Sequence, residues 1–215
     1  MIWQRNLCYR LFASSAIIEN VKETSSAGSA HVAYFFFDFR DTEKQNACAL
    51  LTSILVQLSH QSDYFCEVLL DLYSAHHLGS QQPKHGALLQ CLQDILRASQ
   101  QVPTYIVLDA LDECSDSSGV QSNRKKVLDL IKELVKLHLP NLRLFITSRL
   151  EVDIRTVLGP LTSTSNCVTL HDESGQKQDI VDYINSVVRS DIMKDLREED
   201  KKLIIQTLSD RADGM

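Results

Sequence analysis

The sequence lacks the features of two large protein classes. Acidic residues outnumber Lys and Arg by 28 to 22, which gives a formal net charge of −6 and no basic excess of the kind that favours nucleic-acid binding. No apolar run approaches the roughly 20 residues that a membrane-spanning helix needs. We therefore expect neither a nucleic acid nor a membrane as a partner.

Closely spaced cysteine pairs of the kind that bind zinc are also missing. The six cysteines include no C-x-x-C pair, so the ligand spacing of a zinc site is absent. Several of them fall on apolar faces of predicted helices, where a free thiol packs as a small hydrophobic group. This usage fits a reducing compartment, and we expect a cytoplasmic protein.

A third absence concerns phosphate binding, because the chain contains no G-x-x-x-x-G-K-[ST] loop. Yet residues 104–114 read TYIVLDALDEC, in which an apolar run predicts a strand buried on both faces. Three carboxylates follow within five residues: Asp109, Asp112 and Glu113. Carboxylates this close to a core are costly unless a cation or a proton-transfer role accounts for them.

Hydrophobic periodicity predicts alternating strands and helices. Strands are expected at 32–39, 104–109, 142–147 and 167–170, and helices at 14–23, from 40 to about 58, and at 63–75, 87–100, 124–138, 152–158, 178–189 and 198–211. Strands separated by helices need crossover connections, which predicts an α/β fold: a three-layer sandwich with a mainly parallel sheet. Ligands of such sheets bind at the carboxyl ends of the strands.

The acidic strand end has two interpretations. Asp109 can hold Mg²⁺, directly or through water, while Asp112 or Glu113 accepts a proton from an attacking water or orients it. Alternatively, Asp112 and Glu113 complement the dipole at the start of a helix. The second interpretation leaves Asp109 and the uninterrupted strand before it unexplained.

The strand at 142–147 ends in Ser148 and Arg149. As a parallel neighbour, it would bring Thr147, Ser148 or Arg149 to the same phosphate, where an arginine can stabilise charge on a γ-phosphoryl group. The alternative is an ion pair from Arg149 to Glu151 or Asp153.

Two other basic positions are interpreted as surface features. We expect Arg40, which follows the first strand, to form a solvated pair with Asp41. The Arg124-Lys125-Lys126 cluster is expected on a solvated surface turn at the start of a helix.

Three segments, YFFFDFRD, YIVLDALDEC and LRLFITSR, occur in an order that resembles the NACHT module of STAND-class P-loop NTPases. The nephrocystin-type N-terminal domain, abundant in large fungal proteins with ankyrin, tetratricopeptide or propeller repeats, is the most similar group. The resemblance covers residues 14–215. It implies an atypical segment at 1–13 in place of the P-loop, an NTPase-like core at 14–175 and a truncated helical extension at 176–215.

The resemblance also implies a site. YIVLDALDEC is similar to the Walker B strand and FITSR to the sensor strand, so Asp109 would bind Mg²⁺, and Asp109 and Ser148 would bind ATP or GTP. Glu113, Asp112 and Arg149 would be catalytic. An intact relative would be a nucleotide-driven switch that relays ligand sensing into oligomerisation.

The chain departs from this pattern where the family has a Gly-Lys-Ser/Thr loop before the helix at Ser14, because residues 1–13 contain neither Gly nor Lys. Losing three charge-assisted hydrogen bonds removes about 4.5 kcal/mol or more, over a thousandfold in affinity. We therefore expect an NTPase fragment with impaired catalysis that acts through protein partners or self-association. The alternatives are an active switch whose loop is lost through a misassigned start or exon, and an unrelated Mg²⁺-dependent phosphotransferase that uses Asp109.

Overall fold

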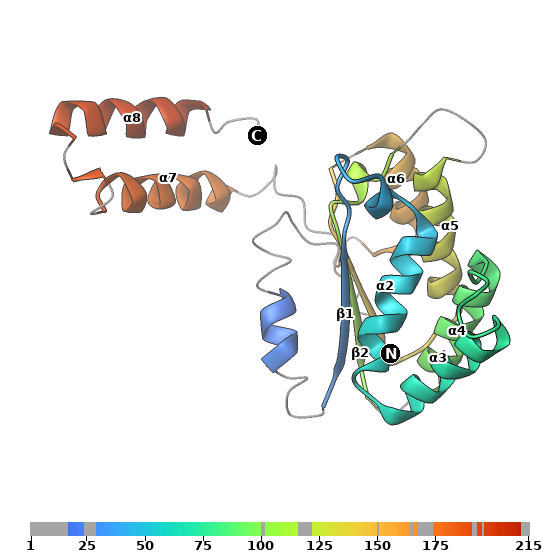
Figure 1. Ribbon diagram of the computed structural model, residues 1–215. Coiled ribbons are helices and arrows are strands. Elements are labelled where there is room, and N and C mark those ends of the chain that lie inside the picture. The colour runs from blue at the N-terminus through green and yellow to red at the C-terminus, as the bar shows by residue number, and fades with distance from the viewer. Residues whose placement is uncertain are drawn as a thin grey trace. The chain divides into compact units, whose positions relative to one another are not determined.

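The computed structural model describes residues 17–23, 29–99, 102–115, 122–149, 151–163, 166, 174–190, 193–194 and 196–211. The chain divides into two units, residues 1–168 and 169–215. The first unit is an α/β layer structure. The second contains two helices in mutual contact, α7 (Ser174–Val188) and α8 (Glu198–Arg211), and α8 has the predicted bounds (Figure 1).

Three parallel strands form the sheet of the first unit in the order β1-β2-β3. They are β1 (His31–Phe36), β2 (Thr104–Asp109) and β3 (Leu142–Ile146). Phe36 pairs with Asp109, and Leu108 pairs with Ile146, so the carboxyl ends of all three strands meet at one edge. The parallel sheet is confirmed, and the strand expected at 167–170 lies outside the described residues.

Helices form the crossover connections between the strands. From β1 to β2 the chain passes through the short 3-10 turn η1 (Thr42–Gln45) and the helices α2 (Ala47–Ser59), α3 (Asp63–Ala75) and α4 (His85–Ala98), and from β2 to β3 through η2 (Leu111–Glu113) and α5 (Asn123–Lys136). After β3 come α6 (Val152–Leu158) and the 3-10 turn η3 (Gly159–Leu161). The predicted bounds of α3 and α6 are confirmed. The helix expected from Arg40 is wrong at its start, because the Asn46 side chain accepts a hydrogen bond from the Ala49 amide at 2.8 Å and caps α2 there.

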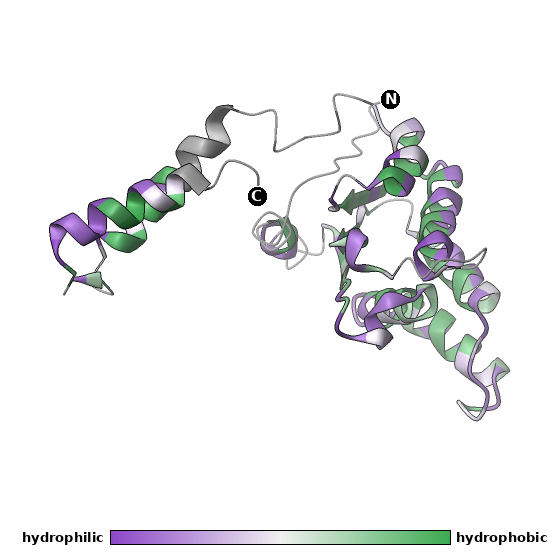
Figure 2. Ribbon diagram, turned by 90° about the horizontal axis from the view of Figure 1, so that it is seen from above, coloured by the Kyte–Doolittle hydropathy of each residue, from purple (hydrophilic) through white to green (hydrophobic). Residues whose placement is uncertain are grey.

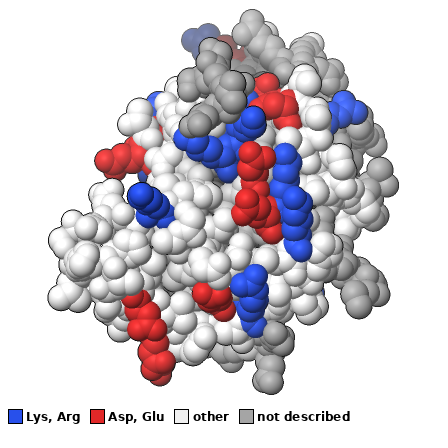
Figure 3. Space-filling view, turned by 90° about the vertical axis from the view of Figure 1, so that its right-hand side faces the viewer, with Lys and Arg blue, Asp and Glu red and all other residues white. Residues whose placement is uncertain are grey.

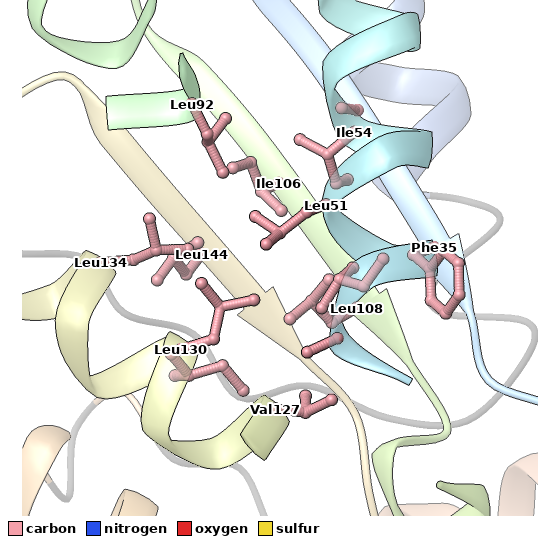
Figure 4. Close-up of a cluster of buried hydrophobic side chains, with 14 of the residues drawn as sticks. Phe35, Leu51, Ile54, Leu92, Ile106, Leu108, Val127, Leu130, Leu134 and Leu144 are labelled. Carbon is pink, nitrogen blue, oxygen red and sulfur yellow. The ribbon is translucent and has the colours of Figure 1, made fainter. Parts of the chain in front are cut away.

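The hydrophobic core lies between one face of the sheet and the helices. Phe35, Ile106, Leu108 and Leu144 point from the strands toward side chains of α2, α4 and α5 (Figure 4). These helices carry hydrophobic residues on one side and hydrophilic residues on another (Figure 2). The core face predicted for α2 is confirmed, since all six residues are buried: Ala47, Leu50, Leu51, Ile54, Leu55 and Leu58. Burial of each leucine or isoleucine side chain of this face stabilises the fold by about 1.5–3 kcal/mol.

The opposite face of the sheet contacts the helical residues 17–23. The ammonium group of Lys22 lies 4.7 Å from the centroid of the Tyr34 ring and 3.4 Å from its hydroxyl. Ile18 and Val21 of the same segment are buried. Helical residues therefore lie on both faces of the sheet, which is the layering expected from the sequence.

The described cysteines divide by burial. Cys91 and Cys114 are buried, whereas Cys48 and Cys66 are exposed. Burial raises the pKa of the Cys91 thiol to about 11, so this group stays protonated at neutral pH and packs as an apolar side chain. Within the described parts of the chain, no helix combines the length and the hydrophobicity that crossing a membrane requires.

Candidate functional site

Asp109 ends the central strand, where its side chain is almost fully enclosed at 2% exposure. The hydroxyl of Thr147, just beyond β3, donates a hydrogen bond to Asp109 Oδ1 at 2.6 Å. The same hydroxyl oxygen accepts a hydrogen bond from the Ala110 amide at 2.9 Å. Because β2 and β3 are parallel neighbours, the sheet itself brings Thr147 to this position.

Thr147 also binds the neighbouring backbone on both sides of Asp109. Its amide donates to the Leu108 carbonyl at 2.9 Å, and its carbonyl accepts from the Leu111 amide at 2.9 Å. Ala110 between them has φ 54° and ψ 48°, a left-handed conformation that costs an L-residue about 1–2 kcal/mol. The four hydrogen bonds of Thr147 therefore hold a strained turn that redirects the chain from β2 into η2.

Asp112 in η2 is bound to Arg149. Its Oδ1 accepts a hydrogen bond from the Arg149 amide at 2.9 Å, and its Oδ2 lies 3.3 Å from Arg149 Nε. The Arg149 side chain is 65% exposed, so this ion pair is worth at most about 1 kcal/mol. Asp112 is thus the described ion-pair partner of Arg149, in place of Glu151 or Asp153. The Ser148 hydroxyl donates to the Arg149 carbonyl at 2.8 Å.

The end of β1 contributes a weaker contact. Glu113 Oε2 accepts a hydrogen bond from the Phe39 amide at 3.4 Å, which joins η2 to the segment after β1. Arg40 pairs with Asp38, at 3.0 Å between Nε and Oδ1, so the pair expected with Asp41 is wrong. The Arg40 guanidinium lowers the pKa of the Asp38 carboxyl by hydrogen bonding. Asp41 instead accepts from the Glu43 amide and caps η1.

Arg124 is a residue beside the site whose burial the sequence interpretation missed. It was expected on a solvated turn but is 9% exposed. From the first turn of α5, Nη2 donates to the Asp112 carbonyl at 2.6 Å and Nε to the Cys114 carbonyl at 2.9 Å. Nη1 lies 3.4 Å from Asp153 Oδ2 in α6. A polar residue that follows a flexible-looking loop gives no sequence signal of such burial, and its neighbours Lys125 and Lys126 are exposed as expected.

The resemblance implies that the site binds Mg²⁺ and a nucleotide. The positions of the carboxylates show whether they could bind the metal ion. Asp109 accepts from Thr147 inside the fold, and Asp112 is bound by Arg149. Among the described residues, no group of three His, Cys, Asp or Glu side chains could hold a metal ion. The described carboxylates alone do not fit a complete Mg²⁺-nucleotide site. The roles of Asp109 in metal binding and of Ser148 in nucleotide binding stay predictions.

A protein-family model described as "Nephrocystin 3, N-terminal" matches residues 11–149. The matched range contains β1, β2 and β3. It also contains the residues at the strand ends: Asp109, Asp112, Glu113, Arg124, Thr147 and Arg149. No curated protein matches the sequence.

Thr147→Val is expected to lower the free energy of unfolding by about 2–4 kcal/mol, because it removes a hydrogen-bond donor to the buried Asp109 carboxylate and the side-chain acceptor of the Ala110 amide. Thr147→Ser keeps the hydroxyl and loses one methyl group, at a cost of about 1 kcal/mol. Urea denaturation followed by circular dichroism measures both. Equal losses for the two variants would contradict the proposed hydrogen bonds.

Arg124→Gln is expected to cost about 2–3 kcal/mol of unfolding free energy, since the Asp112 and Cys114 carbonyls lose a charged donor and Asp153 loses its ion pair. Lys125→Gln removes the same charge from the adjacent exposed position and should stay within about 0.5 kcal/mol of the parent chain. The same urea titration compares the two. A small, similar effect of both substitutions would show that Arg124 does not hold η2.

Proposed function

Because this chain belongs to the nephrocystin 3 N-terminal family, we propose that it is a NACHT-type signalling module that acts through protein contacts, with nucleotide turnover impaired. The supporting observation is that the acids at the strand ends are engaged inside the fold. Asp109 is bonded to Thr147, Asp112 to Arg149 and Glu113 to the Phe39 amide. These bonds give the acidic cluster a structural role that needs no bound cation.

The phosphate side of the site supports the same proposal. In the sequence, residues 1–13 contain neither Gly nor Lys, although a phosphate-binding loop is expected before the helix that begins near Ser14. A helix N-terminus alone attracts an anion by only about 0.3–1 kcal/mol. It cannot replace the three charge-assisted hydrogen bonds, about 4.5 kcal/mol in total, that such a loop supplies.

A module of this kind would act by joining proteins in the cytoplasm, through a partner or through copies of itself. The family match covers the α/β unit up to Arg149 and leaves out α7 and α8. We therefore assign the proposed interaction role to the α/β unit.

The second candidate is an active ATP- or GTP-hydrolysing STAND switch, whose phosphate loop is encoded by a missed exon or upstream start. One observation favours it: the pairing of β2 with β3 places Asp109, Ser148 and Arg149 at the same edge of the sheet. In that case Asp109 would bind Mg²⁺, Ser148 would contact the nucleotide, Asp112 or Glu113 would orient water, and Arg149 would stabilise phosphoryl charge.

Titration with Mg-ATP and Mg-GTP separates the two candidates. We expect dissociation constants no tighter than about 1 mM, since loss of the loop removes over a thousandfold from a micromolar affinity. Isothermal calorimetry of the parent chain and of Asp109→Asn, which keeps an acceptor for Thr147, should give the same weak signal. Micromolar binding that disappears in Asp109→Asn would overturn the proposal and favour the active switch.

A further inference from the structure

A groove of about 440 Å³ lies between α2, α3 and α4. Its lining is almost entirely apolar and includes Leu55 and Val56 of α2 with Leu69, Leu70 and Tyr73 of α3. None of the strand-end residues described above lines it. The groove is therefore a feature separate from the candidate nucleotide site.

Large apolar side chains on its rim are open to solvent. Val56 is 44% exposed, Leu70 55% and Tyr73 49%. The α2 sequence, ACALLTSILVQLS, contains no charged residue, although Thr52 and Val56 face outward. Most of the surface formed around α3, α4 and α5 is uncharged, with charged side chains gathered in short groups (Figure 3). The groove and its exposed rim form an apolar surface of the kind that serves as an interaction site.

An acidic stripe runs beside the groove on α3. Asp63, Glu67 and Asp71 are spaced at i, i+4 and i+8, so they lie on one side of the helix, and all three are exposed. In the described part of the chain, none of them forms an ion pair. A partner that fits this surface therefore combines bulky apolar side chains with positive charges along one side.

The loop after α3 holds one wall of the groove in place. His77, Leu78 and Gly79 all have positive φ, at 52°, 51° and 86°, and form a left-handed turn. A Cβ atom at Gly79 would lie 2.7 Å from Cε2 of Tyr73, so the ring rests directly on the glycine backbone. Glycine is needed at position 79 because its φ is positive and because a Cβ atom would collide with the Tyr73 ring. The groove is thus shaped before a partner arrives, which lowers the entropic cost of binding.

We propose that this groove docks an amphipathic helix of a partner protein, with large apolar residues at i, i+4 and i+7 and Lys or Arg on the flank that faces the acidic stripe. Insertion of a helix into an apolar groove is a recurring mode of peptide recognition. The inference deepens the proposed function and rests on it in one respect, that the chain acts through protein contacts.

The test uses two fluorescein-labelled 18-residue model helices with the same leucine stripe, one with Lys and one with Glu on its polar face. Fluorescence anisotropy of the full chain should show saturable binding of the Lys peptide, with the Glu peptide at least about tenfold weaker. Leu70→Ser, at a half-exposed position, should weaken the Lys peptide by about tenfold without lowering the melting temperature appreciably.

Charge-reversed triple variants supply the matched control. Replacing Asp63, Glu67 and Asp71 by Lys should weaken the Lys peptide by about tenfold, whereas replacing Glu198, Glu199 and Asp200 of α8 by Lys changes the net charge equally and should leave binding unchanged. Equal weakening by both triple variants, or full affinity in Leu70→Ser, would overturn the proposal. So would a peptide-free dimer that these groove variants convert to a monomer, since a second copy would then be the occupant.

The same preparation is titrated with Mg-ATP, so that the proposal of impaired nucleotide turnover and the groove proposal are tested independently. Micromolar nucleotide affinity with intact Lys-peptide binding overturns the impaired-turnover proposal and supports the groove. Absence of Lys-peptide binding together with absence of nucleotide binding overturns the groove proposal alone.

Discussion

A buried carboxylate at the end of the central strand is the constraint on which this site depends. Asp109 is enclosed by the sheet, and an unpartnered charge there would be far too costly for a fold of ordinary stability. Thr147, just beyond the neighbouring strand β3, donates a hydrogen bond to this carboxylate, and its hydroxyl oxygen also accepts from the Ala110 amide and so fixes the turn there. The position of η2, and with it of Asp112 and Glu113, follows from this contact.

The bonds around η2 join all three strand ends. Arg149 binds Asp112 from the end of β3, and the Phe39 amide binds Glu113 from the end of β1. From α5, Arg124 binds the Asp112 carbonyl of η2 and the Cys114 carbonyl just beyond it. Each carboxylate that suggested catalysis thus has a structural partner. The carboxyl ends of parallel strands often bind nucleotides. In this chain, the groups at these ends are hydrogen-bonded to one another.

The sequence predicted those parts of the fold that depend on periodicity. The core face of α2, the bounds of α3 and α6 and the parallel orientation of the strands follow from apolar spacing and crossover length. Local capping by Asn46 and the burial of Arg124 do not, because both depend on contacts that spacing does not encode. Near β3, the sequence analysis assigned roles to Ser148 and Arg149 and named Thr147 only as a further residue at the same strand end. The fold distinguishes Thr147 as a hydrogen-bond partner of Asp109.

The strand-end amides are bonded within the protein, and we propose that they do not receive a nucleotide. Two-dimensional ¹⁵N–¹H NMR of the Ala110, Leu111 and Arg149 amides during addition of Mg-ATP tests it most directly, because these groups donate to Thr147 and Asp112. We expect the shifts of these amides to stay unchanged up to about 1 mM nucleotide. Saturable shifts of these three amides with a micromolar midpoint would contradict it.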